Sequence, residues 1–131
     1  MLVLIIDDDT EDRELFLEAV GKIDPSIKCY SAKDGREAIH VMTNELIVLP
    51  DYIFLDINMP VMNGRECLIE IKKNSKLKTI PVIMYSTTSD TNEIKGFYSL
   101  GAYDFLIKPA NFSKLMDALA SIIVVKKANK K

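Results

Sequence analysis

Residues 54–64 read Phe-Leu-Asp-Ile-Asn-Met-Pro-Val-Met-Asn-Gly, and the rest of the chain is organised around this stretch. Apolar residues lead into Asp56, and a Met-Pro turn and Gly64 follow it. An apolar run that ends in a carboxylate and then turns sharply is typical of a buried strand whose last residue emerges at a sheet edge. Ligands of open parallel sheets bind beyond the carboxyl ends of the strands. The pattern therefore predicts that Asp56 lies where such folds carry out chemistry.

The composition limits the class of protein. The chain has 131 residues, 48% of them hydrophobic and 27% charged, which predicts one soluble globular domain. A net charge of −2 argues against direct binding of nucleic acid, which favours a basic face. No apolar run approaches the roughly 18 residues of a membrane span, and no signal peptide is recognisable, so we expect a cytoplasmic protein without membrane contact. Cys29 and Cys67 lie in apolar runs and are expected to be reduced, buried thiols.

Five strand-like runs alternate with five helical patterns. We predict strands at residues 1–6, 27–32, 51–56, 80–86 and 104–107, and helices at 10–20, 35–46, from 63 or 64, at 90–100 and at 113–126. This alternation implies an α/β fold with a five-stranded parallel sheet and helices on both faces. Right-handed crossovers leave few strand orders, and we choose the doubly wound, flavodoxin-like order 2-1-3-4-5. Residues 1–126 should form a single domain, and residues 127–131 a basic tail that frays.

Polar side chains stand at the ends of four predicted strands: Asp7 and Asp8, Asp56, Ser86 and Lys108. With the chosen strand order these four ends meet in one crevice. Three crowded carboxylates repel one another, so at least one should resist ionising unless a cation is present. Mg²⁺ prefers oxygen ligands and binds through one or two carboxylates plus a phosphate. A carboxylate nucleophile, a metal, a lysine and a hydroxyl around one point suit phosphoryl transfer to Asp56.

Four motifs in order carry a resemblance to a known family. They are Leu-Ile-Ile-Asp-Asp-Asp, the 54–64 stretch, Pro-Val-Ile-Met-Tyr-Ser-Thr and Gly-Ala-Tyr-Asp-Phe-Leu-Ile-Lys-Pro. Over residues 2–125 the chain resembles a stand-alone, chemotaxis-regulator-like receiver domain of the response regulators in two-component signalling. The resemblance implies a signalling switch rather than an enzyme, with a histidine kinase or phosphotransfer protein as phosphoryl donor. It also supports the strand order, which this family exemplifies.

The resemblance assigns roles around the acidic crevice. Asp56 looks like the phosphoacceptor, and Asp7 and Asp8 look like the acidic pair that holds Mg²⁺, directly or through water. Asp56 itself and the backbone carbonyl of Asn58 would complete the metal site. Asp9 is left out of the site. The spacing from Asp8 to Asp56 is a few residues longer than usual, and we place the extra length around residues 43–49.

Two further residues of the crevice take roles from the same resemblance. Ser86 looks like the switch hydroxyl, and Lys108 like the phosphate-binding lysine. A cis peptide bond before Pro109 is expected to aim this lysine at Asp56. Asn58 and Thr88 should flank the path of attacking water and tune hydrolysis of the phosphorylated aspartate.

The signal is expected to leave through one face of the fold. Phe105 occupies the switch aromatic position, and phosphorylation should let it swing into space that Ser86 vacates. Ile94 and Tyr98 lie one helical turn apart and should form a small exposed apolar patch beside Phe105, whereas Phe97 should be buried. The patch would bind a downstream protein partner or a second copy of the chain, through the fourth helix, fifth strand and fifth helix. Because no further domain follows the last helix in this sequence, we expect the output to be a protein contact or onward phosphoryl transfer.

Other interpretations compete with this one. Asp7, Asp8 and Asp9 could simply cap the first helix, and Lys108 taken alone could be a solvated surface lysine. An aspartate-nucleophile phosphatase of the haloacid-dehalogenase type needs a second aspartate at position 58, where this chain has Asn58. A receiver-like interaction module that is never phosphorylated usually lacks one of the key residues, and this chain has all of them. That module remains the alternative to the phosphoacceptor switch.

Overall fold

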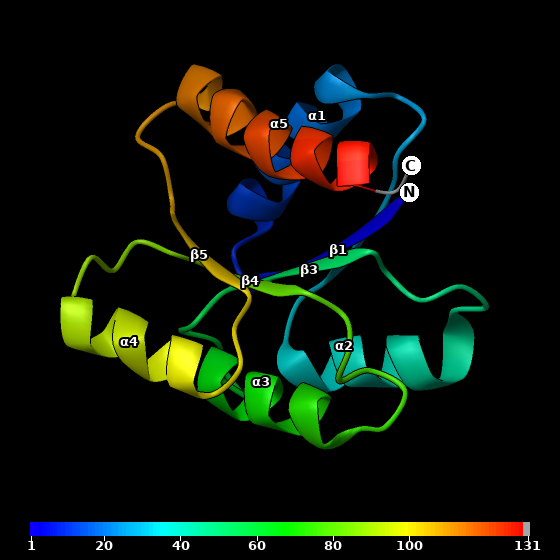
Figure 1. The fold of residues 1–131 in the computed structure, drawn as a ribbon, viewed down its shortest axis with the longest axis vertical. Helices are drawn as coiled ribbons and strands as arrows, with labels where there is room; N and C mark the ends of the chain where they lie inside the picture. The colour runs from blue at the N-terminus through cyan, green and yellow to red at the C-terminus, as the bar shows by residue number, and fades with distance from the viewer. Residues whose placement is uncertain (130–131) are drawn as a thin grey trace.

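The central sheet has five parallel strands in the order β2-β1-β3-β4-β5 (Figure 1). The computed structural model describes residues 1–129. The strands are β1 (Leu2–Ile6), β2 (Lys28–Ala32), β3 (Tyr52–Leu55), β4 (Val82–Ser86) and β5 (Asp104–Ile107). The predicted α/β class and the doubly wound order are therefore confirmed. The polar residues of β2 follow from its place at the edge of the sheet.

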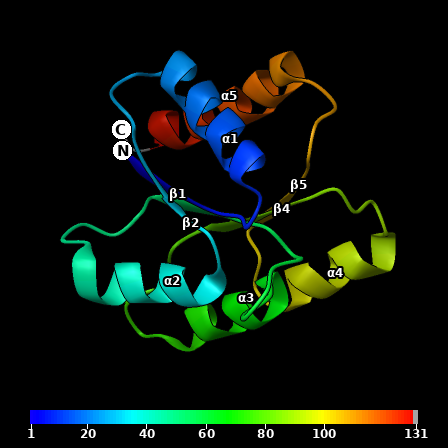
Figure 2. The ribbon, with the colours of Figure 1, turned by 180° about the vertical axis from the view of Figure 1, so that it is seen from behind.

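Helices cover both faces of the sheet, as Figures 1 and 2 show from opposite sides. Helices α1 and α5 lie over one face, and α2, α3 and α4 lie over the other. Their bounds are α1 (Thr10–Ile23), α2 (Gly35–His40), α3 (Gly64–Lys73), α4 (Thr91–Ser99) and α5 (Phe112–Asn129), with a π-helical turn η1 (Val41–Glu45) directly after α2. The crossovers therefore leave the carboxyl ends of β1, β3, β4 and β5 at a common edge.

Two apolar cores hold the layers together, one on each face of the sheet. Every residue of β1, β3 and β4 is buried, which explains their continuous apolar sequences. On the α1 face Phe16 packs on Phe54, with ring centroids 4.9 Å apart. Leu15 of α1 is 38% exposed, whereas Val20 is buried. Val20 follows Phe16 by one helical turn, so it shares the inner face that Leu15 borders.

The second predicted helix is altered near its end. We predicted one helix over residues 35–46, whereas α2 ends at His40 and passes into η1. The N–H of Leu46 donates to the carbonyl of Val41 at 3.0 Å, which is the wider pairing of a π turn. A π turn accommodates one residue more than an α-helical turn does. The turn η1 overlaps residues 43–49, where we place the extra length.

The last helix is longer than predicted, because α5 extends to Asn129. Residues 130 and 131 of the tail that we expect to fray lie outside the described residues, and the fraying stays a prediction. Among residues 1–129, no helix is both long and apolar enough to cross a membrane.

Both cysteines are free thiols. Cys67 is fully buried, as predicted, whereas Cys29 is only half-buried. Burial raises the pKa of each thiol to about 12. Because the thiolate is the reactive form, neither cysteine is suited to nucleophilic chemistry near neutral pH.

Candidate functional site

The predicted acidic residues meet at the carboxyl edge of the sheet. Asp7 and Asp8 follow β1, and Asp56 follows β3, the strand beside it. The N–H of Asp56 donates to the carbonyl of Ile6 at 2.9 Å, which extends the ladder by one residue. Carboxylate oxygens of the three aspartates all lie within 4.8 Å of one another. Asp7 is fully buried, Asp56 is 7% exposed and Asp8 is exposed, so the cluster opens to solvent on one side.

Lys108, directly after β5, brings a positive charge to this cluster. Its backbone N–H donates to the carbonyl of Ser86 at 2.8 Å, and its side chain is only 13% exposed. The Nζ atom lies 2.8 Å from Asp7 Oδ2 and 3.7 Å from Asp56 Oδ1. It also lies 2.8 Å from Asp12 Oδ2, in the first turn of α1. Asp12 was missed in the sequence, because acidic residues at the start of a helix are explained by the helix dipole alone.

The predicted cis bond before Pro109 is wrong, because no peptide bond in the described chain is cis. The trans bond is compatible with the position of the lysine. The hydrogen bond to Ser86 keeps the Lys108 backbone in line with β4, and the flexible side chain alone spans the distance to Asp7.

The helix-capping interpretation of the acidic run holds for one residue. Asp9 is the N-cap of α1, and its side chain accepts a hydrogen bond from the N–H of Asp12 at 3.0 Å. Asp7 instead accepts from the N–H of Asp9 at 3.0 Å and pairs with Lys108. Asp7 therefore belongs to the cluster, and Asp9 stays out of it as expected.

Burial and a neighbouring negative charge both disfavour the ionised form of Asp56. Burial, followed by the charge of Asp7, raises the pKa of Asp56 from 3.8 to about 7, although Lys108 acts in the opposite direction. Burial by itself would lower the pKa of Lys108, but its hydrogen bonds to Asp12 and Asp7 raise that pKa above its ordinary value. With protein groups alone, the site has more negative charge than its lysine can neutralise. This excess charge is what a bound cation would remove.

The raised pKa makes a prediction about stability without metal. Between pH 4 and 7 native Asp56 keeps a proton that the unfolded chain has lost, so the wild-type protein loses stability as pH rises through this range. Asp56→Asn removes the titrating group, and in chelator at pH 8 it should be more stable than wild type by on the order of 3 kcal/mol. Urea unfolding at pH 5 and pH 8 measures the difference, which should be much smaller at pH 5. Glu11→Gln, which removes an exposed carboxylate, is the control. A gain that is equal at both pH values would contradict the assigned titration.

The turn after Asp56 is tightly built. The N–H of Gly64 donates to the carbonyl of Ile57 at 2.7 Å, closing the loop between β3 and α3. Within it Val61 has a φ of 68°, a conformation that a β-branched residue rarely adopts. Asn63 and Glu66 then form a capping box at the start of α3, each side chain accepting from the other's backbone N–H. The loop thus connects Asp56 to a firmly capped helix.

The hydroxyl residues at the end of β4 connect the site to α4. Ser86 is buried, and its Oγ accepts a hydrogen bond from the N–H of Thr88 at 3.3 Å. The Thr88 hydroxyl donates to Glu93 Oε2, at 3.1 Å, in the first turn of α4. Asn58 is exposed and lines a cavity of about 340 Å³ together with Glu93 and Phe97. Asn58 and Thr88 therefore both lie beside the first turn of α4.

The predicted switch residues lie on α4 and β5. Phe105 is half-buried, with its ring centroid 6.1 Å from that of Phe97, which is buried as predicted. Tyr98 is 44% exposed and Ile94 is half-buried, so the expected exposed patch is only partly open. The Tyr98 hydroxyl donates to Asp104 Oδ1 at 3.1 Å, a contact between α4 and β5 that the sequence did not indicate.

A family model described as the response regulator receiver domain matches residues 3–120 of this chain. The chain belongs to this family. Receiver domains are switches of two-component signalling, which take phosphoryl groups from histidine kinases and pass the signal to partner proteins.

Similar proteins agree with this assignment. The response regulator Rcp1 of Synechocystis sp. (strain ATCC 27184 / PCC 6803 / Kazusa) is 29% identical over 125 residues, covering 92% of this chain and 85% of the relative. A crystal structure of the Mn²⁺-bound form of Rcp1 has a TM-score of 0.80 at 28% identity, over 92% of this chain and 90% of the other. The phosphorylated cyanobacterial phytochrome response regulator RcpA has a TM-score of 0.84 at 32% identity, over 92% and 89%.

Some relatives are longer than this receiver domain. The transcriptional regulatory protein MalR of Bacillus subtilis is 35% identical over 118 residues, which cover 90% of this chain but 48% of MalR. The chain thus spans about half the length of that relative. What the two share is the receiver domain.

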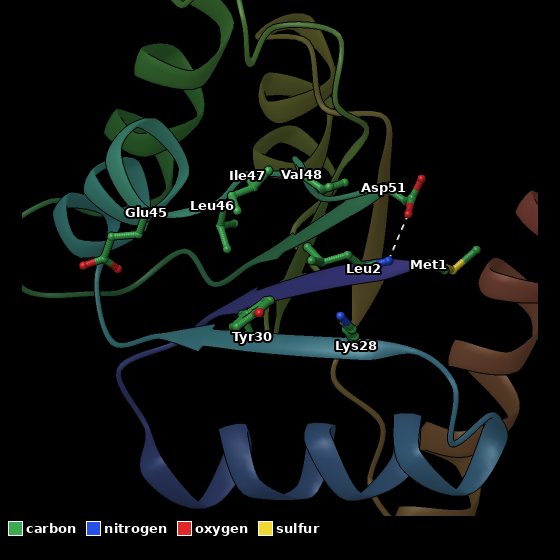
Figure 3. Close-up of a pocket in the computed structure, with 9 residues that line it drawn as sticks. All are labelled: Met1, Leu2, Lys28, Tyr30, Glu45, Leu46, Ile47, Val48 and Asp51. Carbon is green, nitrogen blue, oxygen red and sulfur yellow. Dashed lines mark hydrogen bonds between the residues drawn. The ribbon is translucent and has the colours of Figure 1, made fainter.

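This receiver domain also has a larger cavity, of about 630 Å³, away from the acidic cluster (Figure 3). It lies at the amino ends of β1 and β2, where Leu2 and Lys28 begin the two strands. Ile47 and Val48 in its wall are 100% and 66% exposed. The N–H of Leu2 donates to Asp51 Oδ2 at 2.9 Å, drawn as the dashed line in Figure 3. The acidic cluster and Lys108 lie at the opposite, carboxyl ends of the strands.

Proposed function

We propose that this receiver domain accepts a phosphoryl group on Asp56 from a phosphohistidine of a histidine kinase or phosphotransfer protein. A carboxylate oxygen of Asp56 attacks phosphorus, the phosphorus–nitrogen bond breaks, and the imidazole nitrogen keeps the bonding electron pair and takes up a proton. The observation that carries the proposal is the convergence of three carboxylates within 4.8 Å, with the ammonium of Lys108 beside them.

The donor set suits a hard divalent cation such as Mg²⁺. All three aspartates offer oxygen, and burial together with the charge of Asp7 raises the pKa of Asp56, so a cation beside it would favour its carboxylate form. We infer that Asp7, Asp8, Asp56 and the backbone carbonyl of Asn58 would hold the ion. When bound, it would neutralise charge on the phosphoryl oxygens and so assist attack by Asp56. The Mn²⁺-bound form of Rcp1 supports a metal in a similar fold.

The proposed output is a change of the surface made by α4, β5 and α5. Phosphorylation adds a charge of roughly −1.5 to −2. Lys108 and the Ser86 hydroxyl are near enough to donate hydrogen bonds to the phosphoryl oxygens. When Ser86 turns toward the phosphoryl group, its Oγ leaves the N–H of Thr88 and the β4–α4 loop is free to shift. Phe105 has no hydroxyl, so apolar packing against Phe97 is what would hold it inward. A downstream protein partner or a second copy of the chain would read the change.

The catalysis we propose is limited to the protein's own phosphorylation and dephosphorylation. Asn58 and Thr88 are uncharged and cannot act as strong bases toward the attacking water. Thr88 is further engaged by Glu93, which keeps its hydroxyl hydrogen directed toward α4. These two residues would set the lifetime of the phosphorylated state through access of water to Asp56.

Phosphorylation in the presence and absence of metal tests this function. We expect one phosphoryl group per chain after incubation with acetyl phosphate and Mg²⁺, and almost none in excess chelator, as measured by mass spectrometry of the intact protein. Asp8→Ala should weaken Mg²⁺ binding and labelling together, because it removes one ligand. Efficient labelling in chelator would contradict the role of the metal. No labelling by acetyl phosphate or by phosphohistidine donors would favour the unphosphorylated interaction module.

A further inference from the structure

The ammonium of Lys108 has a second close partner that lies outside the proposed metal site. Its Nζ atom is 2.8 Å from Asp7 Oδ2 and 2.8 Å from Asp12 Oδ2, whereas Asp56 Oδ1 is 3.7 Å away. The lysine therefore lies between β1 and α1, beside the phosphoacceptor and not in hydrogen-bonding contact with it. A carboxylate from α1 shares the lysine with the site.

The start of α1 is fixed in a way that places Asp12. The side chain of Asp9 accepts the N–H of Asp12 at 3.0 Å, and Arg13 Nη1 donates to the backbone carbonyl of Asp7 at 2.7 Å. The first turn of α1 is thus tied both to its own cap and to the end of β1. Because the side chain of Asp12 is 37% exposed, its charge is maintained at a lower desolvation cost than that of the fully buried Asp7.

A metal at the proposed site would change the surroundings of the lysine. Asp7 would become a ligand, and the metal would repel the ammonium at short range. Lys108 would then lose one of its two close partners, while Asp12 is not among the proposed ligands. The 2.8 Å contact between Asp12 Oδ2 and Lys108 Nζ is present in the metal-free protein.

We propose that Asp12 is a positioning residue, which holds the Lys108 ammonium beside Asp56 when a divalent cation takes Asp7. This inference rests on the proposed function, since it concerns the same metal and phosphoryl site. By binding the Lys108 ammonium, Asp12 reduces the repulsion between this ammonium and the divalent cation. It also keeps the ammonium in position to donate hydrogen bonds to the phosphoryl oxygens.

Metal binding by matched variants tests the proposal. Asp12→Asn should raise the Mg²⁺ dissociation constant roughly fivefold in calorimetry, a size consistent with one partly exposed ion pair. Glu11→Gln removes the same charge from the same turn of α1 and should change it less than about twofold. Asp12→Glu keeps the charge within reach of Lys108 and should restore binding close to the wild-type value. Thermal unfolding of each variant checks that the fold is intact.

A second background separates action through the lysine from a general charge effect. When Lys108 is replaced by methionine, Asp12→Asn should weaken Mg²⁺ binding no more than Glu11→Gln does. An equal effect of Asp12→Asn with and without Lys108 would overturn the proposal. So would equal Mg²⁺ affinities for Asp12→Asn and Glu11→Gln in the presence of Lys108.

The lysine can also be observed directly. In Mg²⁺-loaded wild-type protein the ¹⁵N–¹H signal of the Lys108 ammonium should be protected from exchange with water, and Asp12→Asn should remove this protection. A signal that is unchanged in Asp12→Asn would overturn the inference. If the wild-type protein neither binds Mg²⁺ nor accepts phosphate, the proposed function fails. If it does both and Asp12→Asn behaves as Glu11→Gln, only the role of Asp12 fails.

Discussion

Asp56→Asn is expected to reduce phosphorylation by acetyl phosphate to background. The amide has no carboxylate oxygen that can attack phosphorus, and no nearby group takes over its position at the end of β3. The fold should survive, because Oδ1 of the residue accepts a hydrogen bond from the N–H of Ile57 at 2.9 Å and an asparagine carbonyl can do the same. Mass spectrometry of the intact protein in Mg²⁺ measures the loss.

Asp9→Asn provides the matched control. It removes the carboxylate that directly follows Asp7 and Asp8 in the chain, and asparagine caps a helix about as well as aspartate does. This variant should therefore label like the wild-type protein. Labelling that persists in Asp56→Asn, mapped to Asp7 or Asp8 in a digest, would show that the acceptor has been assigned to the wrong carboxylate.

Gly64→Ala is expected to cause a large loss of stability. A Cβ atom at this position would overlap the backbone carbonyl oxygen of Asp56 and lie 2.7 Å from Cα of Ile57. Both are main-chain atoms at the end of β3, so neither can shift without moving Asp56. We expect a loss of about 3 kcal/mol or more in the free energy of unfolding, at the upper end of the cost of overpacking.

Gly96→Ala separates this clash from the general effect of adding a methyl group. Gly96 lies in α4, and a Cβ atom there would meet nothing within 4 Å. Replacing a helical glycine with alanine should stabilise the protein by about 0.5–1 kcal/mol. Urea unfolding of both variants gives the comparison. A Gly64→Ala protein as stable as the wild type would mean that the loop after Asp56 can relax, contrary to its short hydrogen bond to Ile57.

The parts of the fold that the sequence predicted are those that depend on local patterns. Strands β1, β3 and β4 are buried on both faces, so each is a continuous apolar run that ends at a polar residue. The order of the strands and the roles of the site residues depended on the family resemblance as well. Asp7, Asp8 and Asp56 could be grouped because the carboxyl ends of neighbouring parallel strands must coincide.

The parts that could not be predicted depend on individual side chains and hydrogen bonds. The π turn after α2 differs from an α-helix by one step in hydrogen-bond pairing, which apolar periodicity does not reveal. The contact of Asp12 with Lys108 depends on the conformation of a long side chain that extends from the end of β5 to α1. The peptide bond before Pro109 is trans, so the expected cis bond does not orient this lysine. The half-burial of Ile94 depends on how closely α4 lies against its neighbours, which spacing alone does not give.

The pairing of Lys108 with Asp7 joins residues that are 101 positions apart in the chain. During synthesis, Asp56, Asp7 and Asp8 leave the ribosome well before Lys108, which balances their charge. A chain interrupted before β5 would carry three mutually repelling carboxylates without this counter-charge, and contacts between distant segments are the slowest to form. Under the proposed function, phosphorylation of Asp56 would therefore require that β5 and Lys108 have been synthesised and folded.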